Sequence, residues 1–443
     1  MSRKLTALSS LKAKLEIMDQ SEFPTPQSCC IYRVPPQLRE VNEAAYTPMM
    51  VSIGPFHHGN KRLSSMEEFK LWFLKNFLKR TQGTSFDNYD NYVHVLRNQE
   101  IKIRRCYSEI IPMGSDEFIR MILTDACFII EYFLLWIDED EDCLHPKLWS
   151  FLDIKRDLIL LENQLPFFVL RDLFDLTYPN GDNHGRSIEF VTYRYFDSAF
   201  MFLLVPNKQL REKFTFSYFV QHHLPRLPDG TPHVYHLCDM LRICYVRLDQ
   251  LPRERNDNKL KHVYSACKLH DAGIKFEVNA DEISLLKLQY SKGVLKIPEV
   301  MISDSTETLL RNVAAFEQFQ FRDSRSMIDY IIFLEHFIRS EKDVEILEEN
   351  RVIQNNIGEN DAVASITKRL GMHTKYVNYN NDYISLFKEL NEICDSPCQR
   401  YIEIFKQQYW STPWRIASFL GAIFLLFLTL IQTISSVFAF FQN

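Results

Sequence analysis

Residues 118–138 read FIRMILTDACFIIEYFLLWID, and this stretch decides the fold class of most of the chain. It is apolar nearly all round, whereas a helix on a protein surface carries a polar face. Three charged residues, Arg120, Asp125 and Glu131, interrupt it, which makes it too polar for a membrane span. The stretch therefore predicts a helix buried at the centre of a globular body.

Helical spacing of apolar residues recurs on both sides of this stretch. Residues 154–176 carry one such stripe, and Pro166 should kink or split the helix there. That stripe consists of Leu158, Leu161, Leu165 and Phe168. Two further stripes lie nearer the C-terminus: Met327, Ile331, Leu334 and Ile338 form one, and Val363, Ile366 and Leu370 form the other. Gly accounts for only 12 of the 443 residues, which also favours helices over tightly turning β structure. The expected fold is mainly α.

Residues 273–303 depart from the helical trend. Leu286, Leu288 and Tyr290 alternate with polar residues, and a Ser-Lys-Gly sequence at 291–293 is typical of a turn. This pattern predicts a small β-element within the helical body. We expect the body to span residues 28–410 after an N-terminal extension, 1–27, with a possible internal boundary at the turn-rich PNGDNHGRS, 179–187.

Residues 416–441 form a second kind of apolar stretch, IASFLGAIFLLFLTLIQTISSVFAFF, which contains no charged residue. About 20 apolar residues cross a bilayer core, so this stretch predicts a transmembrane helix within a C-terminal anchor, 411–443. The expected membrane-facing positions are Ile416, Leu420, Phe424, Leu428, Ile431 and Phe441, and the expected interfacial residues are Tyr409, Trp410, Trp414 and Arg415.

Basic residues lie on the N-terminal side of this stretch: Arg400, Lys406 and Arg415. The positive-inside rule then places the body in the cytosol. Residues 1–20 contain no apolar run of signal-peptide length, so we expect a single-pass, tail-anchored protein at the plasma membrane or an endomembrane. A buried core helix and a GPI-attachment signal are the alternatives for the C-terminal stretch.

Composition argues against several functional classes. The net charge is −6 and no basic block stands out, so the chain lacks the electrostatic footprint of a nucleic-acid binder. Its ten Cys are scattered, which is typical of reduced, mostly buried thiols. The chain contains no GxxxxGK, GxSxG or HExxH motif. We therefore predict neither an enzyme nor a cofactor-binding protein.

Two groups of His residues are the candidates for ligand or metal binding. His57 and His58 lie in SIGPFHHG, where a functional loop competes with two imidazoles packed in a turn. The second group consists of His222, His223, His233, His236, Cys238 and Cys244. His233 and His236 would share a helical face, but zinc needs four convergent ligands and this spacing does not demand them. No metal site is predicted.

Three carboxylates lie in apolar surroundings: Asp125, Glu131 and Glu162. Two of them could serve as acid and base, as in glycoside hydrolysis. The alternative, which we favour, is a structural network in which the carboxylates pair with cations. Arg120, Arg156 and Arg171 are the expected partners.

Seven blocks of the chain resemble, in order, the plant protein family known as domain of unknown function 247. They read CIYRVPPQLREVNEAAYTPMMVSIGPFHHG (30–59), MEEFKLWFL (66–74), DACFIIEYF (125–133), DLILLENQLPFFVL (157–170), ACKLHDAGIKF (266–276), GVLKIPEVMISDSTETLLRNVAAFEQ (293–318) and PWRIASFLGAIFLLFLTLIQT (413–433). Ala126 stands where the family usually has Gly. The resemblance implies a plant protein with a helical body and a C-terminal anchor, but no agreed reaction.

Some grass members of that family are similar to determinants of pollen self-incompatibility, which implies recognition or signalling in one branch. Together with the expected anchor, this favours a non-enzymatic interaction protein whose partners are the lipid bilayer and unidentified proteins. The alternative is a membrane-tethered hydrolase that uses the buried carboxylates or the His clusters.

Overall fold

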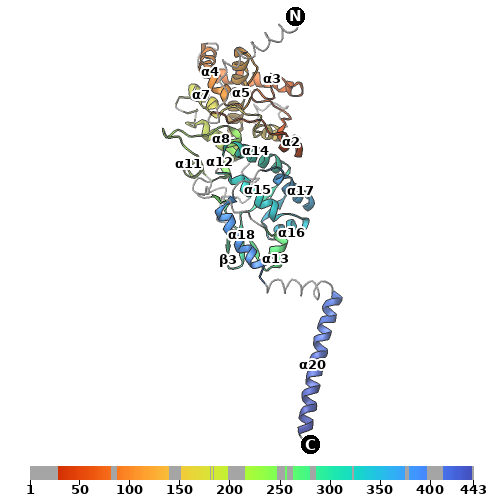
Figure 1. The fold of residues 1–443 in the computed structure, drawn as a ribbon. Helices are drawn as coiled ribbons and strands as arrows, with labels where there is room; N and C mark the ends of the chain where they lie inside the picture. The colour runs from red at the N-terminus through yellow and green to blue at the C-terminus, as the bar shows by residue number, and fades with distance from the viewer. Residues whose placement is uncertain are drawn as a thin grey trace, which may run out of the picture.

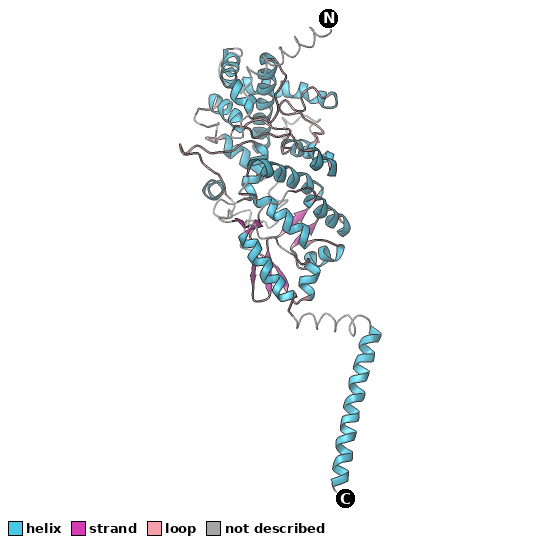
Figure 2. Cartoon of the chain, viewed as in Figure 1, coloured by secondary structure: helices cyan, strands magenta, loops and turns pink. Residues whose placement is uncertain are grey.

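The computed structural model describes residues 28–80, 87–138, 151–179, 181–182, 184–197, 215–246, 255–256, 263–279, 286–321, 324–374, 379–396 and 413–441. Most of these residues are α-helical, and the few strands are short (Figure 2). The prediction of a mainly α fold is therefore confirmed.

Helix α5, Ser115–Ile137, forms the centre of the N-terminal half, as predicted. All of its residues from Phe118 to Leu135 are buried except Arg120. Four helices pack against it: α3 (Ser64–Arg80), α4 (Asp87–Arg105), α7 (Phe167–Thr177) and α8 (Ile188–Phe196). An apolar helix surrounded in this way needs no polar face, which explains the composition of the stretch.

The stripe predicted over residues 154–176 is not one helix. Helix α6, Phe151–Leu158, ends first, residues 159–166 form an irregular turn, and α7 starts directly after Pro166. Pro166 therefore splits the helix, as expected, but Leu161 and Leu165 are buried in the turn and not on a helical face. Proline lacks the N–H that a continuous helix would require, and it is tolerated at a helix start.

Helix α14, Asp304–Gln320, has the corresponding position in the C-terminal half. It packs against α12 (Leu237–Tyr245), α15 (Ser326–Phe337), α17 (Asn360–Gly371) and α6, so it also connects the two halves. Helices α16 (Glu341–Glu349), α13 (Ala266–Asp271) and α18 (Asn381–Cys394) complete this half. One hydrophobic core runs through both halves, with buried members on each side of the turn-rich segment 179–187.

The predicted β-element is confirmed. Strands β2 (Lys275–Val278), β4 (Val294–Ile297) and β3 (Gln289–Ser291) form a sheet in that order, with β2 parallel and β3 antiparallel to β4. Lys292 and Gly293 connect β3 to β4 and both have positive φ, as a type I′ hairpin turn requires.

The other described elements are short. They are α2 (Pro36–Val41), η1 (Glu43–Tyr46), η2 (Lys61–Leu63), α11 (Phe216–His222), the β5–β6 pair (Val300–Ile302 and Ile353–Asn355) and the β1–β7 pair (Arg255–Asn256 and Tyr379–Asn380).

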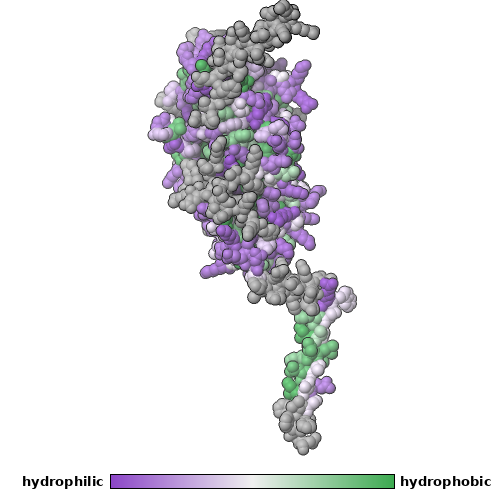
Figure 3. All heavy atoms as spheres, in the orientation of Figure 1, coloured by the Kyte–Doolittle hydropathy of each residue, from purple (hydrophilic) through white to green (hydrophobic). Residues whose placement is uncertain are grey.

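Helix α20, Pro413–Phe441, extends away from the body (Figure 1). Within it, Trp414–Ser436 is long and apolar enough to cross a membrane, and none of it is buried in the protein. Its surface is mainly hydrophobic, in contrast to the largely polar surface of the body (Figure 3). The alternative of a buried core helix is therefore wrong for this segment.

Candidate functional site

The irregular turn between α6 and α7 carries three consecutive buried polar residues, Glu162, Asn163 and Gln164. A turn of this kind leaves backbone groups without helical partners, and buried polar groups must find others. Gln164 meets part of this demand, since its side-chain amide donates to the carbonyls of Leu158 and Leu160. The polar side chains of this otherwise apolar stretch therefore have a structural role, because they bind backbone groups that the turn leaves without helical partners.

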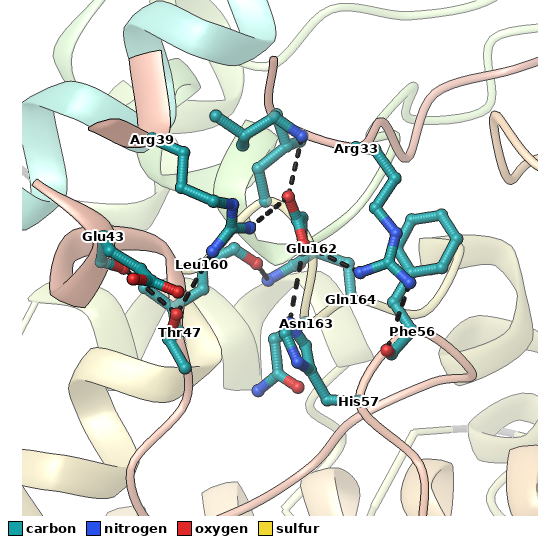
Figure 4. A network of polar contacts seen from close by, with 12 residues as sticks. Arg33, Arg39, Glu43, Thr47, Phe56, His57, Leu160, Glu162, Asn163 and Gln164 are labelled. Carbon is teal, nitrogen blue, oxygen red and sulfur yellow. Dashed lines mark hydrogen bonds and ion pairs between the residues drawn. The ribbon is translucent and has the colours of Figure 1, made fainter. Parts of the chain in front are cut away.

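Glu162 binds the N-terminal segment of the body through both carboxylate oxygens (Figure 4). Oε2 accepts a hydrogen bond from Arg33 Nη1 at 2.9 Å. Oε1 accepts from Arg39 Nη2 at 2.5 Å and from the backbone N–H of Val34 at 2.7 Å. Charge-assisted bonds of this kind are about twice as strong as neutral ones. We call these residues, together with His57, the Glu162 cluster.

His57 faces the same carboxylate, with its Nε2 3.6 Å from Glu162 Oε2. Burial lowers the pKa of His57 to about 4, although Glu162 opposes the shift. The imidazole is therefore neutral at neutral pH. Arg33 also contacts a second carboxylate, Glu109, outside the cluster. The two guanidinium groups of Arg33 and Arg39 thus balance the charges of Glu162 and Glu109.

A second carboxylate in this region, Asp157, binds mainly backbone. It accepts from the N–H groups of Met49, Met50 and Val51, at 2.6 to 3.0 Å. Burial raises the pKa of Asp157 to about 6, and the three backbone donors oppose this effect. Asn163 extends the contact, since its Oδ1 accepts from the N–H of Ile53. Side chains thus bind the backbone N–H groups of the segment 49–53, which belongs to no helix or strand.

Lys70 forms the second ionic cluster, on α3. Its Nζ lies 2.7 Å from Asp125 Oδ1, 2.8 Å from Glu67 Oε1 and 3.2 Å from Ser52 Oγ. The other oxygen of Asp125 accepts from the N–H of Gly54. We call Lys70, Asp125, Glu67 and Ser52 the Lys70 cluster.

A surface hollow of about 400 Å³ lies beside the Lys70 cluster. Its lining comprises His58, Glu67, Leu71, Glu117, Arg120, Met121, Thr124 and Asp125. Acidic and basic side chains both line it, so its charge does not select one class of ligand.

The segment 52–58 lies between the two clusters and contacts both. At one end, Ser52 belongs to the Lys70 cluster and the N–H of Gly54 donates to its Asp125. At the other end, the carbonyl of Phe56 accepts from Arg33 and the ring of His57 faces Glu162. Gly54 is needed for this course because its φ is +70° and a Cβ there would lie 2.5 Å from the carbonyl oxygen of Gln164. The SIGPFHHG sequence therefore serves as a packed connection.

The predicted His and Cys group is dispersed. His236 Nε2 bonds to the carbonyl of Cys30, and its Nδ1 accepts from the N–H of Asp239. His236 thus caps α12, and residues 233–236 are not helical, so the shared helical face with His233 was wrong. His223 bonds to the carbonyl of Ile243. Cys238 and Cys244 are free, buried thiols, and the ring of His222 lies against that of Tyr218 at an angle of 38°.

In the part of the chain that the structure describes, no three His, Cys, Asp or Glu side chains converge as metal ligands would.

The buried carboxylates are paired, but with cations other than those expected. Lys70 pairs with Asp125, and Arg33 and Arg39 pair with Glu162, whereas the predicted partners were Arg120, Arg156 and Arg171. Arg156 instead lies 3.4 Å from Asp157, and Arg171 lies 2.7 Å from Glu189. Arg120 lines the hollow near Asp125, and Glu131 is buried within α5.

Sequence reasoning missed Lys70, Asp157 and the two arginines of the Glu162 cluster. Lys70 gave no signal, because a lysine within a helical pattern is usually exposed. Arg33 and Arg39 had a weak signal, since each lies in the block CIYRVPPQLREV near a pair of prolines. Their pairing joins residues more than 120 positions apart, which periodicity cannot reveal.

Of the positions predicted to face the membrane, Leu420, Phe424, Leu428 and Ile431 are exposed on α20, and Ile416 is partly exposed. Trp414 and Arg415 are exposed at its start. Tyr409 and Trp410 lie outside the described residues, and the side chain of Phe441 is not described.

The contacts of the buried carboxylates favour a structural role for them over a catalytic one. Both oxygens of Glu162 are engaged by donors, and Asp125 and Asp157 are likewise held by cations or backbone N–H groups. A carboxylate in this state stabilises the fold, because removing its partners would leave a buried charge. Together these side chains fasten the segment 33–58 onto α3, α5 and the α6–α7 turn.

The chain is similar to two plant proteins along most of its length. UPF0481 protein At3g47200 of Arabidopsis thaliana is 28% identical over 437 residues, which cover 94% of this chain and 88% of the relative. Putative UPF0481 protein At3g02645, from the same plant, is 24% identical and covers 98% of this chain and 94% of its own length. No solved structure matches the chain. The family model described as plant protein of unknown function, DUF247, matches residues 31–428, so the chain belongs to this family.

Proposed function

We propose that this protein is a tail-anchored membrane protein whose helical body lies in the cytosol and binds other proteins. The observation that carries the proposal is α20, a helix whose segment Trp414–Ser436 is apolar and is not buried in the protein. Twenty-three helical residues span about 34 Å, which is enough for a hydrocarbon core of about 30 Å.

The energetic argument concerns the apolar side chains of this helix. Phe424, Leu425 and Leu426 are each more than 60% exposed. Transfer of such side chains from water to an apolar environment contributes about 1.5–3 kcal/mol each. Summed over the helix, this favours the bilayer over water by far more than the few kcal/mol that usually separate folded states.

The orientation is supported by the charges at the start of the helix. Arg415 lies at the beginning of α20, and Lys406 and Arg400 precede it by nine and fifteen residues. Basic residues close to a span favour the cytosolic side. The body, which precedes these residues, would then face the cytosol.

A binding role is supported by the use of the buried polar groups. The carboxylates of the Glu162 and Lys70 clusters are occupied by partners within the protein, which leaves the outer surface of the body for interaction. Confinement to a membrane raises the effective concentration of the body toward partners on the same surface, which favours weak and reversible contacts.

Fractionation of the full-length protein tests the membrane proposal. We expect the protein to sediment with membranes in the absence of detergent and to remain there after an alkaline carbonate wash. A version that ends before Ser411 should move to the soluble fraction. Recovery of the full-length protein in the soluble fraction would overturn the proposal.

Protease protection tests the orientation, because a cytosolic body on intact microsomes is digested without detergent. Proximity labelling in plant tissue tests the binding role. We expect the set of labelled proteins to change when α20 is removed, and an unchanged set would contradict an anchoring role.

A membrane-tethered hydrolase is the second candidate, because His57 Nε2 lies 3.6 Å from Glu162 and His58 lines a hollow beside Asp125. Screening the purified protein against ester and glycoside substrates separates the two proposals. Turnover that is lost in His57→Ala or His58→Ala, with an unchanged melting temperature, would favour the hydrolase.

A further inference from the structure

Two distant segments of the body meet in a short parallel bridge between Ile31 and Tyr107. The N–H of Ile31 donates to the carbonyl of Cys106 at 2.8 Å, and the N–H of Ser108 donates to the carbonyl of Ile31 at 2.9 Å. This is the bonding pattern of a parallel ladder. Cys30 and Cys106 each precede a bridged residue, so they lie opposite one another, one step along the ladder.

The position of these two cysteines suits a covalent link. Neighbouring strands lie about 4.8 Å apart, and side chains of opposed residues in a ladder point to the same face. Disulfides require Cα atoms about 4.4–6.8 Å apart. The side chains of Cys30 and Cys106 are close enough for each to shift the pKa of the other, and the Cys106 thiol donates to the carbonyl of Lys102 at 3.3 Å. Both residues are buried, at 3% and 6% exposure.

We propose that Cys30 and Cys106 form a reversible disulfide when the protein meets a peroxide. In the first step the Cys106 thiolate attacks one oxygen of hydrogen peroxide and the O–O bond breaks. The departing hydroxide takes up a proton from solvent, so the products are a sulfenic acid on Cys106 and water. The Cys30 sulfur then attacks the Cys106 sulfur, an S–S bond forms and a second water leaves. In total the two thiols lose two protons and two electrons, and the peroxide is reduced to two waters.

The environment assigns the roles of the two thiols. The hydrogen bond from Cys30 lowers the pKa of Cys106, and the nearby ammonium of Lys102 acts in the same direction against burial. The hydrogen bond with Cys106 and burial both raise the pKa of Cys30. Cys106 is therefore the more acidic of the two thiols and the one that reacts first, and Cys30 is the thiol that completes the bond.

The link would affect the segment that carries the Glu162 cluster. Arg33 and Val34 follow Cys30 by three and four residues, and both bind Glu162. A bond from Cys30 to Cys106, directly after α4, would fix the start of this segment to the helical body. The disulfide would therefore make local opening of the N-terminal segment less favourable, and its reduction would permit this opening.

Peptide mapping of the full-length protein in detergent micelles tests the proposal without any variant. The protein is treated with graded hydrogen peroxide, free thiols are blocked by alkylation, and the digest is analysed by mass spectrometry. We expect one cross-linked peptide pair that joins Cys30 to Cys106, lighter by two hydrogens than the sum of the free peptides. Dithiothreitol should restore both alkylatable thiols.

Variants supply the matched controls. Cys106→Ala should abolish the link, whereas Cys267→Ala, which removes a thiol away from this bridge, should retain it. Limited proteolysis near residue 28 should be slower after oxidation of the wild type and unchanged after oxidation of Cys106→Ala. Cleavage that is equally fast in oxidised and reduced wild type would contradict the effect on the segment.

Two mapping results would overturn the assignment. One is a link from Cys106 to Cys29, the adjacent buried thiol, in place of Cys30. The other is recovery of both Cys30 and Cys106 as free thiols at peroxide doses that oxidise the remaining cysteines.

Discussion

The ammonium group of Lys70 lies 2.7 Å from Oδ1 of Asp125, and the two side chains are only 0% and 2% exposed. Burial alone would lower the pKa of Lys70, but Asp125 and Glu67 outweigh it and raise this pKa above the ordinary value of lysine. The lysine is therefore charged inside the body. Because Asp125 also accepts from Gly54, the pair fastens the segment 52–58 to α3 and α5.

Removal of one member of this pair should destabilise the fold. Asp125→Ala leaves the buried ammonium of Lys70 with Glu67 and Ser52, and loss of one partner from a buried pair costs about 3–5 kcal/mol. The free energy of unfolding in urea, measured on the full-length protein in micelles, checks this value. The double variant Lys70→Met/Asp125→Leu removes both charges and should lose less. A double variant as unstable as Asp125→Ala would contradict the role of the unpaired charge.

Gly54 and Gly59 form a matched pair for a test of close packing. Both have positive φ, +70° and +77°, but only at Gly54 would a Cβ meet a neighbour, at 2.5 Å from the carbonyl oxygen of Gln164. Gly59→Ala should therefore lose only the conformational term, about 1 kcal/mol, and Gly54→Ala about 3 kcal/mol or more. Thermal unfolding of both variants checks the difference, and equal melting temperatures would be inconsistent with it.

Glu317 gives a pH-dependent contribution to stability. It is fully buried and accepts from the N–H groups of Met327 and Ile328 at the start of α15. Burial raises the pKa of Glu317 to about 7, from 4.5 in the unfolded chain, against the charge of Arg242 and the backbone donors. Between these pH values the folded state holds a proton that the unfolded state has lost, so stability decreases as pH rises.

Glu317→Gln removes this titration while it keeps an acceptor oxygen for the start of α15. The unfolding free energy of the wild type, relative to the variant, should fall by about 3 kcal/mol between pH 4.5 and 7 and then level off. Urea titrations at several pH values provide the measurement. A difference that is constant across this range would show that Glu317 titrates normally.

A charge in the middle of α20 should impair membrane insertion. Arg at the centre of a transmembrane helix costs about 2.5–3.5 kcal/mol, so Phe424→Arg should increase the fraction of protein that remains soluble after expression. Phe424→Leu keeps the apolar surface and serves as the control. Sedimentation after a carbonate wash measures both, and identical distributions would argue against insertion through this helix.

Several elements followed from local sequence alone. The all-round apolar character of 118–138 predicted the central helix α5, because only a helix surrounded by protein or lipid lacks a polar face. The alternation before Ser291-Lys292-Gly293 predicted the β3–β4 hairpin, and Pro166 predicted the break between α6 and α7. The stripe through Leu161 and Leu165 failed, because an irregular turn buries leucines as effectively as a helix does.

The candidate site was predictable only in part. The carboxylates Asp125 and Glu162 stood out, since charges in apolar surroundings require partners. The partners themselves did not, because Lys70, Arg33 and Arg39 reach them across 55, 129 and 123 positions of the chain. Such pairings depend on how the helices pack, and no local pattern records them.

The sequence by itself determined the helical class of the body, the small β-element and the apolar helix at 416–441, because each rests on the solvation of consecutive side chains. Only the tertiary structure decided which cation meets each buried carboxylate and that Cys30 faces Cys106. The physical reason is that hydrophobic periodicity acts over a few residues, whereas ion pairs and thiol contacts form between segments that packing brings together.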